Sequence, residues 1–147
     1  MNEENILKLV AKDAMIKPIL IYEDDDSEKI LKKLKREDIN ACIVVDKDKR
    51  LIGEISDNDI IKLFLHQVKY EPLVQLLNRG YRRNFLYKKA KDIVSKKKVF
   101  VRKETPINEV IEVVFKNEFQ YVPVLNDNDE VVGVITPSSL INLLKKY

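Results

Sequence analysis

The sequence predicts a mixed fold of the α+β or α/β class, made of two βαββα units in tandem that pack as a pseudo-two-fold pair. Short apolar runs that end in turn-forming residues occur twice along the chain, and an amphipathic helical pattern precedes each set. The chain has 147 residues, of which 45% are hydrophobic, so it can bury a core. This apolar content excludes the class of intrinsically disordered proteins.

The repeat consists of three local matches that occur in the same order in each half. The matched segments are Ala41–Asp46 with Tyr121–Asn126, Leu51–Ser56 with Val131–Thr136, and Lys12–Met15 with Lys91–Val94. The first two pairs are 80 residues apart (121 − 41) and the third 79 (92 − 13), which implies one inserted residue. We therefore expect a first repeat at residues 1–67, which includes an N-terminal helix, a basic helical linker at 68–90, and a second repeat at 91–147.

Each unit opens with an apolar strand, expected at Ile19–Ile21 and at Val99–Val101, and continues into a helix. In the first unit Asp25, with Glu28 three residues later, resembles a capping box. In the second unit Thr105 is the expected N-cap, with Pro106 at the first helical position.

Two further strands and a closing helix complete each unit. The strands are joined by polar turns at residues 46–50 and 126–130, which predicts a hairpin, and the closing helices run from Ser56 and from Thr136. A crossover helix between the first two strands makes these strands parallel. One three-stranded sheet with helices on one face leaves its other apolar face uncovered, so we expect two copies to pack together.

Composition and motifs restrict the function. Cys42 is the only cysteine, the net charge is only +3, and the N-terminus is polar rather than a signal peptide, which predicts a reduced, cytoplasmic protein without a membrane anchor. No P-loop, dinucleotide glycine motif, HExxH or cysteine pair occurs. We therefore expect no enzyme, no metal site and no required cofactor.

The repeated segments resemble a tandem of cystathionine-β-synthase (CBS) domains, a pair often called a Bateman module. The resemblance is carried by Ala11–Met15, by Leu51–Ile60, and by Tyr121–Val124 with Val131–Thr136. It implies two clefts that usually bind an adenine nucleotide or a related adenosyl compound. The expected ligands are AMP, ADP, ATP or S-adenosylmethionine.

The family's Ser/Thr-x-x-Asp motif, at the start of each closing helix, implies groups for phosphate and ribose. Ser56 and Asp59 match both positions, whereas in the second copy Thr136 matches but Ser139 replaces the aspartate. A helix N-terminus suits phosphate, and a carboxylate one turn later can accept hydrogen bonds from ribose hydroxyls. Spacing alone favours a plain helix cap for Ser56 and Asp59, while the resemblance favours a ligand site.

Apolar strand residues near this motif are expected to sandwich the adenine ring. The expected residues of the nucleotide site are Ile19, Cys42, Ile43, Ile55, Ser56, Asp59 and Thr136. The second copy departs further from the family at Val94, which replaces a methionine. In the first copy Ile43 replaces the proline that the second copy keeps as Pro123.

A basic cluster from Arg79 to Lys103 and an acidic block from Glu23 to Glu28 are the other charged features. We expect a solvated face, or an attraction between the two blocks within the molecule or a dimer. Tyr81, Phe85 and Tyr87 interleave with the basic residues, so nucleic-acid or anionic-partner binding through the linker, with empty clefts, is the alternative function.

The leading hypothesis is a stand-alone ligand-sensing module that signals in trans to an unidentified protein target. Apolar residues of the closing helices are expected to form a homodimer interface. They are Ile60, Ile61, Phe64, Leu140, Ile141 and Leu144.

Overall fold

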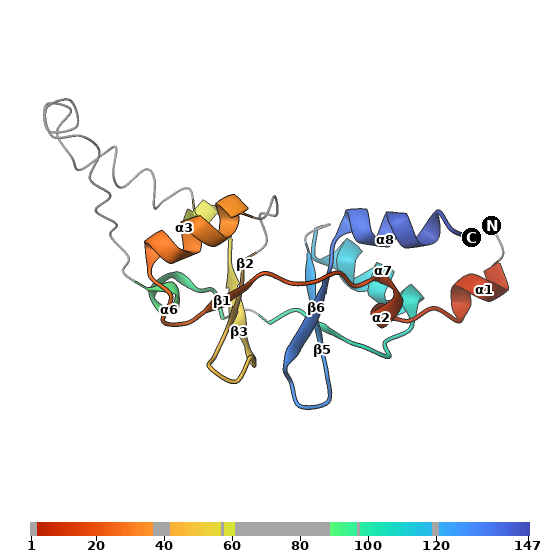
Figure 1. The fold of residues 1–147 in the computed structure, drawn as a ribbon. Coiled ribbons are helices and arrows are strands. Elements are labelled where there is room, and N and C mark those ends of the chain that lie inside the picture. The colour runs from red at the N-terminus through yellow and green to blue at the C-terminus, as the bar shows by residue number, and fades with distance from the viewer. Residues whose placement is uncertain (1–2, 37–41, 57, 61–88, 97, 119–120) are drawn as a thin grey trace, which may run out of the picture.

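The computed structural model describes residues 3–36, 42–56, 58–60, 89–96, 98–118 and 121–147. It contains two three-stranded sheets that lie side by side, with helices over one face of each (Figure 1). The first sheet consists of β1 (Leu20–Tyr22), β2 (Cys42–Val45) and β3 (Leu51–Ile55), and the second of β4 (Val101–Arg102), β5 (Val122–Leu125) and β6 (Val131–Ile135). In each sheet the first two strands are parallel and the last two antiparallel, which confirms the predicted fold class.

The hairpins form because an Asx side chain closes each turn. Asp46 Oδ1 accepts hydrogen bonds from the N–H groups of Asp48 and Arg50, at 2.8 and 3.0 Å. Asn126 Oδ1 does the same with Asn128 and Glu130, at 2.9 and 3.0 Å. The two hairpins therefore have the same geometry with different charge.

The crossover helices are α3 (Ser27–Arg36) and α7 (Ile107–Lys116), and both expected N-caps were wrong by one residue. Asp26, not Asp25, caps α3, because its Oδ1 accepts from the Lys29 N–H at 2.8 Å. Pro106 occupies the N-cap position of α7 rather than the first helical position. Asp25 and Thr105 instead close the turn after the first strand: they accept from the N–H groups three residues earlier, at 3.0 and 2.9 Å.

The opening segment of each repeat lies on the sheet of the other repeat. Helix α2 (Ala11–Ala14) leads to Ile16, which pairs with Val134 of β6 through two hydrogen bonds of 2.9 and 3.0 Å. Helix α6 (Ala90–Ile93) leads to Ser95, which pairs in the same way with Glu54 of β3. In Figure 1 the red trace accordingly runs from α2, beside the second sheet, across to β1 in the first.

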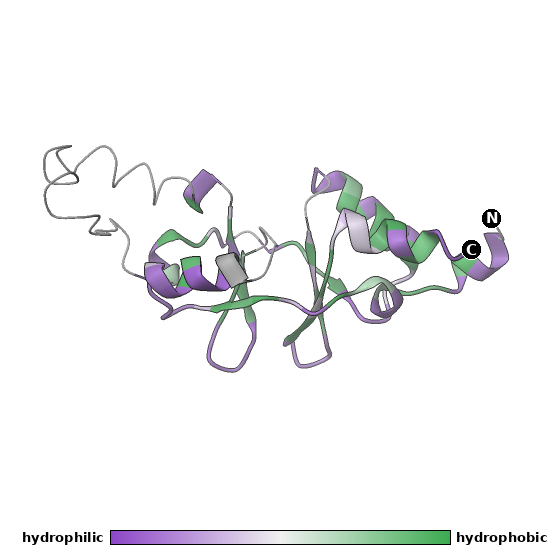
Figure 2. Ribbon diagram, turned by 45° about the horizontal axis from the view of Figure 1, so that its top comes forward, coloured by the Kyte–Doolittle hydropathy of each residue, from purple (hydrophilic) through white to green (hydrophobic). Residues whose placement is uncertain are grey.

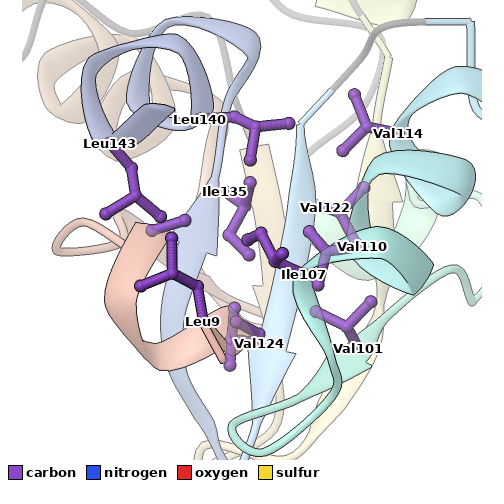
Figure 3. Packing of buried hydrophobic residues seen from close by; sticks show 12 residues of the cluster. Leu9, Val101, Ile107, Val110, Val114, Val122, Val124, Ile135, Leu140 and Leu143 are labelled. Carbon is purple, nitrogen blue, oxygen red and sulfur yellow. The ribbon is translucent and has the colours of Figure 1, made fainter. Parts of the chain in front are cut away.

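The two cores reflect this exchange. Leu9, Ala11 and Ala14 pack into the core of the second sheet, and Figure 3 shows Leu9 among the strand and helix residues of that repeat. Ala90 packs in the same way into the core of the first sheet. The short helix α1 (Glu3–Leu7) contacts α7, so it too belongs spatially to the second repeat.

Each exchanged segment crosses a strand at a glycine. A Cβ atom on Gly53 would lie 2.0 Å from the Ser95 carbonyl oxygen, and one on Gly133 would lie 2.6 Å from Met15 Sδ. Only a residue without a side chain permits this close approach. The repeated glycines of β3 and β6 therefore mark the two crossings.

The sheets meet through their other faces. Ile43, Val45 and Leu51 of the first sheet pack there against Leu125 and Val131 of the second. Figure 2 shows hydrophobic strands at this contact and hydrophilic hairpin turns at one end of it. Burial on both faces explains why β2 and β5 are apolar throughout.

Candidate functional site

Ser56 follows β3 directly and begins the closing helix of the first repeat, of which residues 58–60 are described. Its hydroxyl donates a hydrogen bond to Asp59 Oδ2 at 2.9 Å and accepts one from the Asp59 N–H at 3.2 Å. The Ile60 N–H donates to the Ser56 carbonyl oxygen at 3.1 Å. The structure thus brings Ser56 and Asp59 together at a helix start, with both side chains reachable from solvent.

The second repeat has the same helix start with a closed set of hydrogen bonds. Helix α8 (Pro137–Leu144) is capped by Thr136, whose hydroxyl accepts from the Ser139 N–H at 3.0 Å. Ser139 Oγ accepts from the Thr136 N–H at 2.9 Å and donates to the Thr136 carbonyl oxygen at 3.0 Å. Ser139 is only 8% exposed, so this pair offers a ligand no carboxylate and a hydroxyl that is already bonded.

The apolar site residues do not surround one space. Cys42 and Ile55 are register partners of β2 and β3, and both are buried in the core beneath α3. Ile43 is buried on the opposite face, between the two sheets. Neighbouring residues of a strand point to opposite faces, so Cys42 and Ile43 cannot hold a ring between them.

Ile19 is half-buried. It lies on the crossover segment of the first repeat, which leads from the Ile16–Val134 contact on the second sheet to the start of β1 in the first sheet. The corresponding segment of the second repeat runs beside Ser56, because Ser95 pairs with Glu54 near the end of β3. Val94 also reaches Gly53 there. The sequence carries no signal for these neighbours of Ser56, since it does not say which sheet an opening segment covers.

Tyr121 ties the two repeats together at the start of β2. Its hydroxyl accepts the Cys42 N–H at 3.0 Å, and its carbonyl oxygen accepts from Asn117 Nδ2 at 3.4 Å. The repeat places Ala41 at the corresponding position of the first copy, and alanine has no such group. The start of β2 is therefore held by the second repeat.

The acidic and basic blocks attract each other within the molecule, as one interpretation of the sequence expected. Asp24 Oδ1 lies 3.6 Å from Lys89 Nζ and 3.5 Å from Lys91 Nζ. These side chains are exposed, so the pairs contribute little stability. The linker residues Arg79, Arg82, Arg83 and Lys88, with Tyr81, Phe85 and Tyr87, lie outside the described residues.

Asp25 is a buried carboxylate that pairs with two lysine side chains. Burial alone would raise the pKa of its carboxyl group, but hydrogen bonds from Lys33 Nζ and the Tyr22 N–H, with the charges of Lys33 and Lys29, outweigh it and lower the pKa. The Lys33 contact is 2.6 Å long. The backbone of this turn also contacts the start of α6, because the Asp25 carbonyl oxygen accepts the Ala90 N–H at 2.8 Å.

Within the described ranges, no helix combines the length and the apolar character that a membrane crossing requires.

Comparisons with known proteins agree with this architecture. The family model of the CBS domain matches residues 11–66 and 90–146. Uncharacterized protein MJ1426 of Methanocaldococcus jannaschii is 28% identical over 153 residues, which cover 92% of this chain and 91% of that protein.

Solved structures share the fold at low sequence identity. CBSX2 of Arabidopsis thaliana is 17% identical with a TM-score of 0.71, covering 93% of this chain and 94% of that one, and CBSX2 has also been solved in complex with AMP. The CBS domain pair of protein MJ0100, in complex with 5′-methylthioadenosine and S-adenosyl-L-methionine, is 22% identical with a TM-score of 0.67, covering 94% and 97%. Because the family model matches both halves of the chain, this protein belongs to the CBS domain family and contains two CBS repeats.

Proposed function

We propose that this CBS pair is a regulatory module, not an enzyme, that binds an adenine nucleotide or a related adenosyl compound beside Ser56 and Asp59. The observation that carries the proposal is a hydroxyl and a carboxylate side by side at a solvent-reachable helix start. CBS pairs of the same fold have been solved with AMP, and with 5′-methylthioadenosine and S-adenosyl-L-methionine.

The two groups have complementary tasks in this proposal. The helix start and the Ser56 hydroxyl face an anionic group, and the Asp59 carboxylate accepts hydrogen bonds from vicinal ribose hydroxyls. The bound ribose would compete with Ser56 for Asp59, which breaks their 2.9 Å hydrogen bond. Ligand binding therefore changes the cap of the closing helix, and this change is the signal that the module passes on.

In this proposal most of the apolar site residues do not contact the adenine ring with their side chains. Cys42, Ile43 and Ile55 are buried and hold the strand ends in place, so they contribute through the backbone that they position. Ile19 contributes a half-buried side chain on the crossover segment. Thr136 belongs to the second cleft, which we propose to be weak or empty because Ser139 offers no carboxylate.

We further propose that the module is a cytoplasmic homodimer that acts in trans on a protein target. Of the expected interface residues, Leu140 is buried in its own core and Leu144 packs against that core, whereas Ile141 is 54% exposed. Phe115 of the neighbouring helix α7 is 65% exposed, and Ile111 precedes it by one turn. These three apolar side chains mark the helical face for dimerisation, while Ile61 and Phe64 lie outside the described residues.

The test is a calorimetric titration of the full chain with AMP, ADP, ATP and S-adenosylmethionine. Asp59→Ala should weaken binding of the preferred ligand by about tenfold or more, since it removes a charged hydrogen-bond acceptor. Asn58→Ala, at the adjacent exposed position, is the matched control and should bind as the wild type does. Failure of all four compounds to bind at millimolar concentration, or equal binding by Asp59→Ala, would overturn the proposal.

A further inference from the structure

A groove of about 700 Å³ opens between the two hairpin ends, and its volume lies within the range of about 300–1,000 Å³ typical of small-molecule sites. Leu51 at the start of β3 lines it, whereas Ser56 follows the other end of that strand. At about 3.3 Å per residue, the groove and the Ser56–Asp59 pair are roughly 15 Å apart along the strand. Neither Ser56, Asp59 nor Thr136 lines the groove.

The groove lies beside the place where the two hairpins contact each other, at a β-bridge between Arg50 and Glu130. The Val131 N–H donates to the Lys49 carbonyl oxygen at 2.9 Å at this contact. At the edge of the groove the Asp129 carboxylate forms a 2.7 Å ion pair with Arg102.

The walls of the groove carry more positive than negative charge. Arg50 comes from one hairpin, and Lys96 and Lys98 come from the crossover segment between α6 and β4. Within the described part of the chain, none of these three side chains forms an ion pair. Asp46 and Asp129 also line the groove, so with Arg102 the lining carries four positive and two negative charges.

Arg102 is held in a fixed position at the edge of the groove. One of its nitrogens donates to the Asn126 carbonyl oxygen at 2.7 Å, and its guanidinium lies 5.2 Å from the centre of the Phe100 ring. This contact orients the Phe100 ring, which is 38% exposed although it is large and apolar. Leu51 and Leu125, both almost fully buried, form an apolar floor beside it.

We propose that this groove is a second ligand site, separate from the Ser56–Asp59 site, for a small phosphorylated aromatic molecule. Lys96, Lys98 and Arg50 bind the phosphate, because cationic side chains form their strongest hydrogen bonds with such oxygens. The aromatic part stacks on the Phe100 ring and covers the apolar floor. Three groove residues, Lys96, Lys98 and Arg102, belong to the basic cluster between Arg79 and Lys103. The proposed Ser56–Asp59 site does not involve these three residues.

The test uses para-nitrophenyl phosphate as the probe and amide NMR spectra of the isotope-labelled full chain. The probe should shift the amide signals of Leu51, Phe100 and Leu125 in a saturable way. The double variant K96E/K98E should weaken binding by about tenfold or more. The control K145E/K146E makes the same change of net charge at exposed positions at the far end of α8 and should leave binding unchanged.

Two further variants separate the parts of the proposal. Phe100→Leu should weaken the aromatic probe but leave the binding of inorganic phosphate unchanged, and Asp59→Ala should leave both unchanged. Equal weakening by the two lysine double variants, shifts that do not saturate, or equal binding of probe and inorganic phosphate would each overturn the proposed site. Loss of probe binding in Asp59→Ala would place the probe in the other site and equally overturn it.

Discussion

Each repeat begins a helix directly after its third strand. The two helix starts satisfy their first N–H groups with different side chains. In the second repeat three hydrogen bonds join Thr136 and Ser139, and Ser139 is buried. In the first repeat Ser56 and Asp59 form one side-chain hydrogen bond and remain reachable from solvent. One backbone can therefore carry either a cap with a buried serine or a cap with a solvent-reachable carboxylate, and two side chains make the difference: Ser56 against Thr136 and Asp59 against Ser139.

The turn before each crossover helix shows a second contrast at equivalent positions. Asp25 and Thr105 each accept a hydrogen bond from the N–H three residues earlier. Asp25 is also buried and pairs with Lys33 and Lys29, whereas Thr105 carries no charge. Charged groups therefore stabilise this turn in the first repeat, whereas a neutral hydroxyl stabilises the equivalent turn in the second repeat.

The largest expected effect concerns the two glycine crossings. Gly53→Ala would force the backbone at Ser95 to move, and overpacking of this kind should lower the free energy of unfolding by about 3 kcal/mol. Gly133→Ala faces the Met15 side chain, which can adjust in part, so its cost should be about 1–2 kcal/mol. Urea unfolding of both variants measures the difference. An equal or reversed order would show that the two crossings are not limited by these contacts.

Next in size is the contrast between Asp25 and Thr105. Asp25→Ala leaves the Tyr22 N–H without its acceptor and the Lys33 ammonium with the Leu20 carbonyl oxygen but no carboxylate, and should cost about 2–3 kcal/mol. Thr105→Ala removes one neutral hydrogen bond and should cost about 1 kcal/mol. The same unfolding experiment compares them. A larger loss for Thr105→Ala would contradict the electrostatic interpretation of the first turn.

The smallest expected effect is the pH dependence of stability that Asp25 contributes and that Thr105, its uncharged counterpart in the second repeat, does not. The pKa of Asp25 is lowered from its ordinary value of 3.8, so the unfolded chain binds the proton more readily than the folded one. The stability that this group adds is therefore complete above that ordinary value and is lost as the pH falls through the lower folded value. Unfolding of the wild type and of Asp25→Asn, from neutral pH to about pH 3, should show their difference shrinking in acid. A constant difference would mean that Asp25 does not titrate as described.

Much of the fold could be predicted because the repeat supplies two independent copies of each signal. Strand order and hairpins follow from the apolar runs and their turn residues, such as Asp46 and Asn126. The helix starts were misplaced by one residue because Asp25 and Asp26 are neighbours and either can cap a helix. Tertiary contacts decide between them, since Asp25 is needed by Tyr22 and Lys33.

The exchange of opening segments could not be predicted, because Ala11–Ala14 and Ala90–Ile93 have the same apolar pattern and the two sheets are alike. For the candidate site, sequence placed Ser56 and Asp59 together but also grouped Cys42 with Ile43. The alternation of a strand separates those two side chains, and this signal was available in the sequence. The groove between the hairpins brings together residues far apart in the sequence, such as Arg50, Lys96 and Asp129, which no local pattern encodes.

Because each opening segment packs on the sheet of the other repeat, either half of this chain alone would leave part of its own core uncovered. A hypothetical ancestor with one βαββα unit would have covered its core only by trading that segment with a second molecule, as domain-swapped dimers do. Fusion of two genes then turns an exchange between molecules into one within a chain. After fusion the two halves are free to diverge, and one copy can keep a ligand site while the other becomes its scaffold.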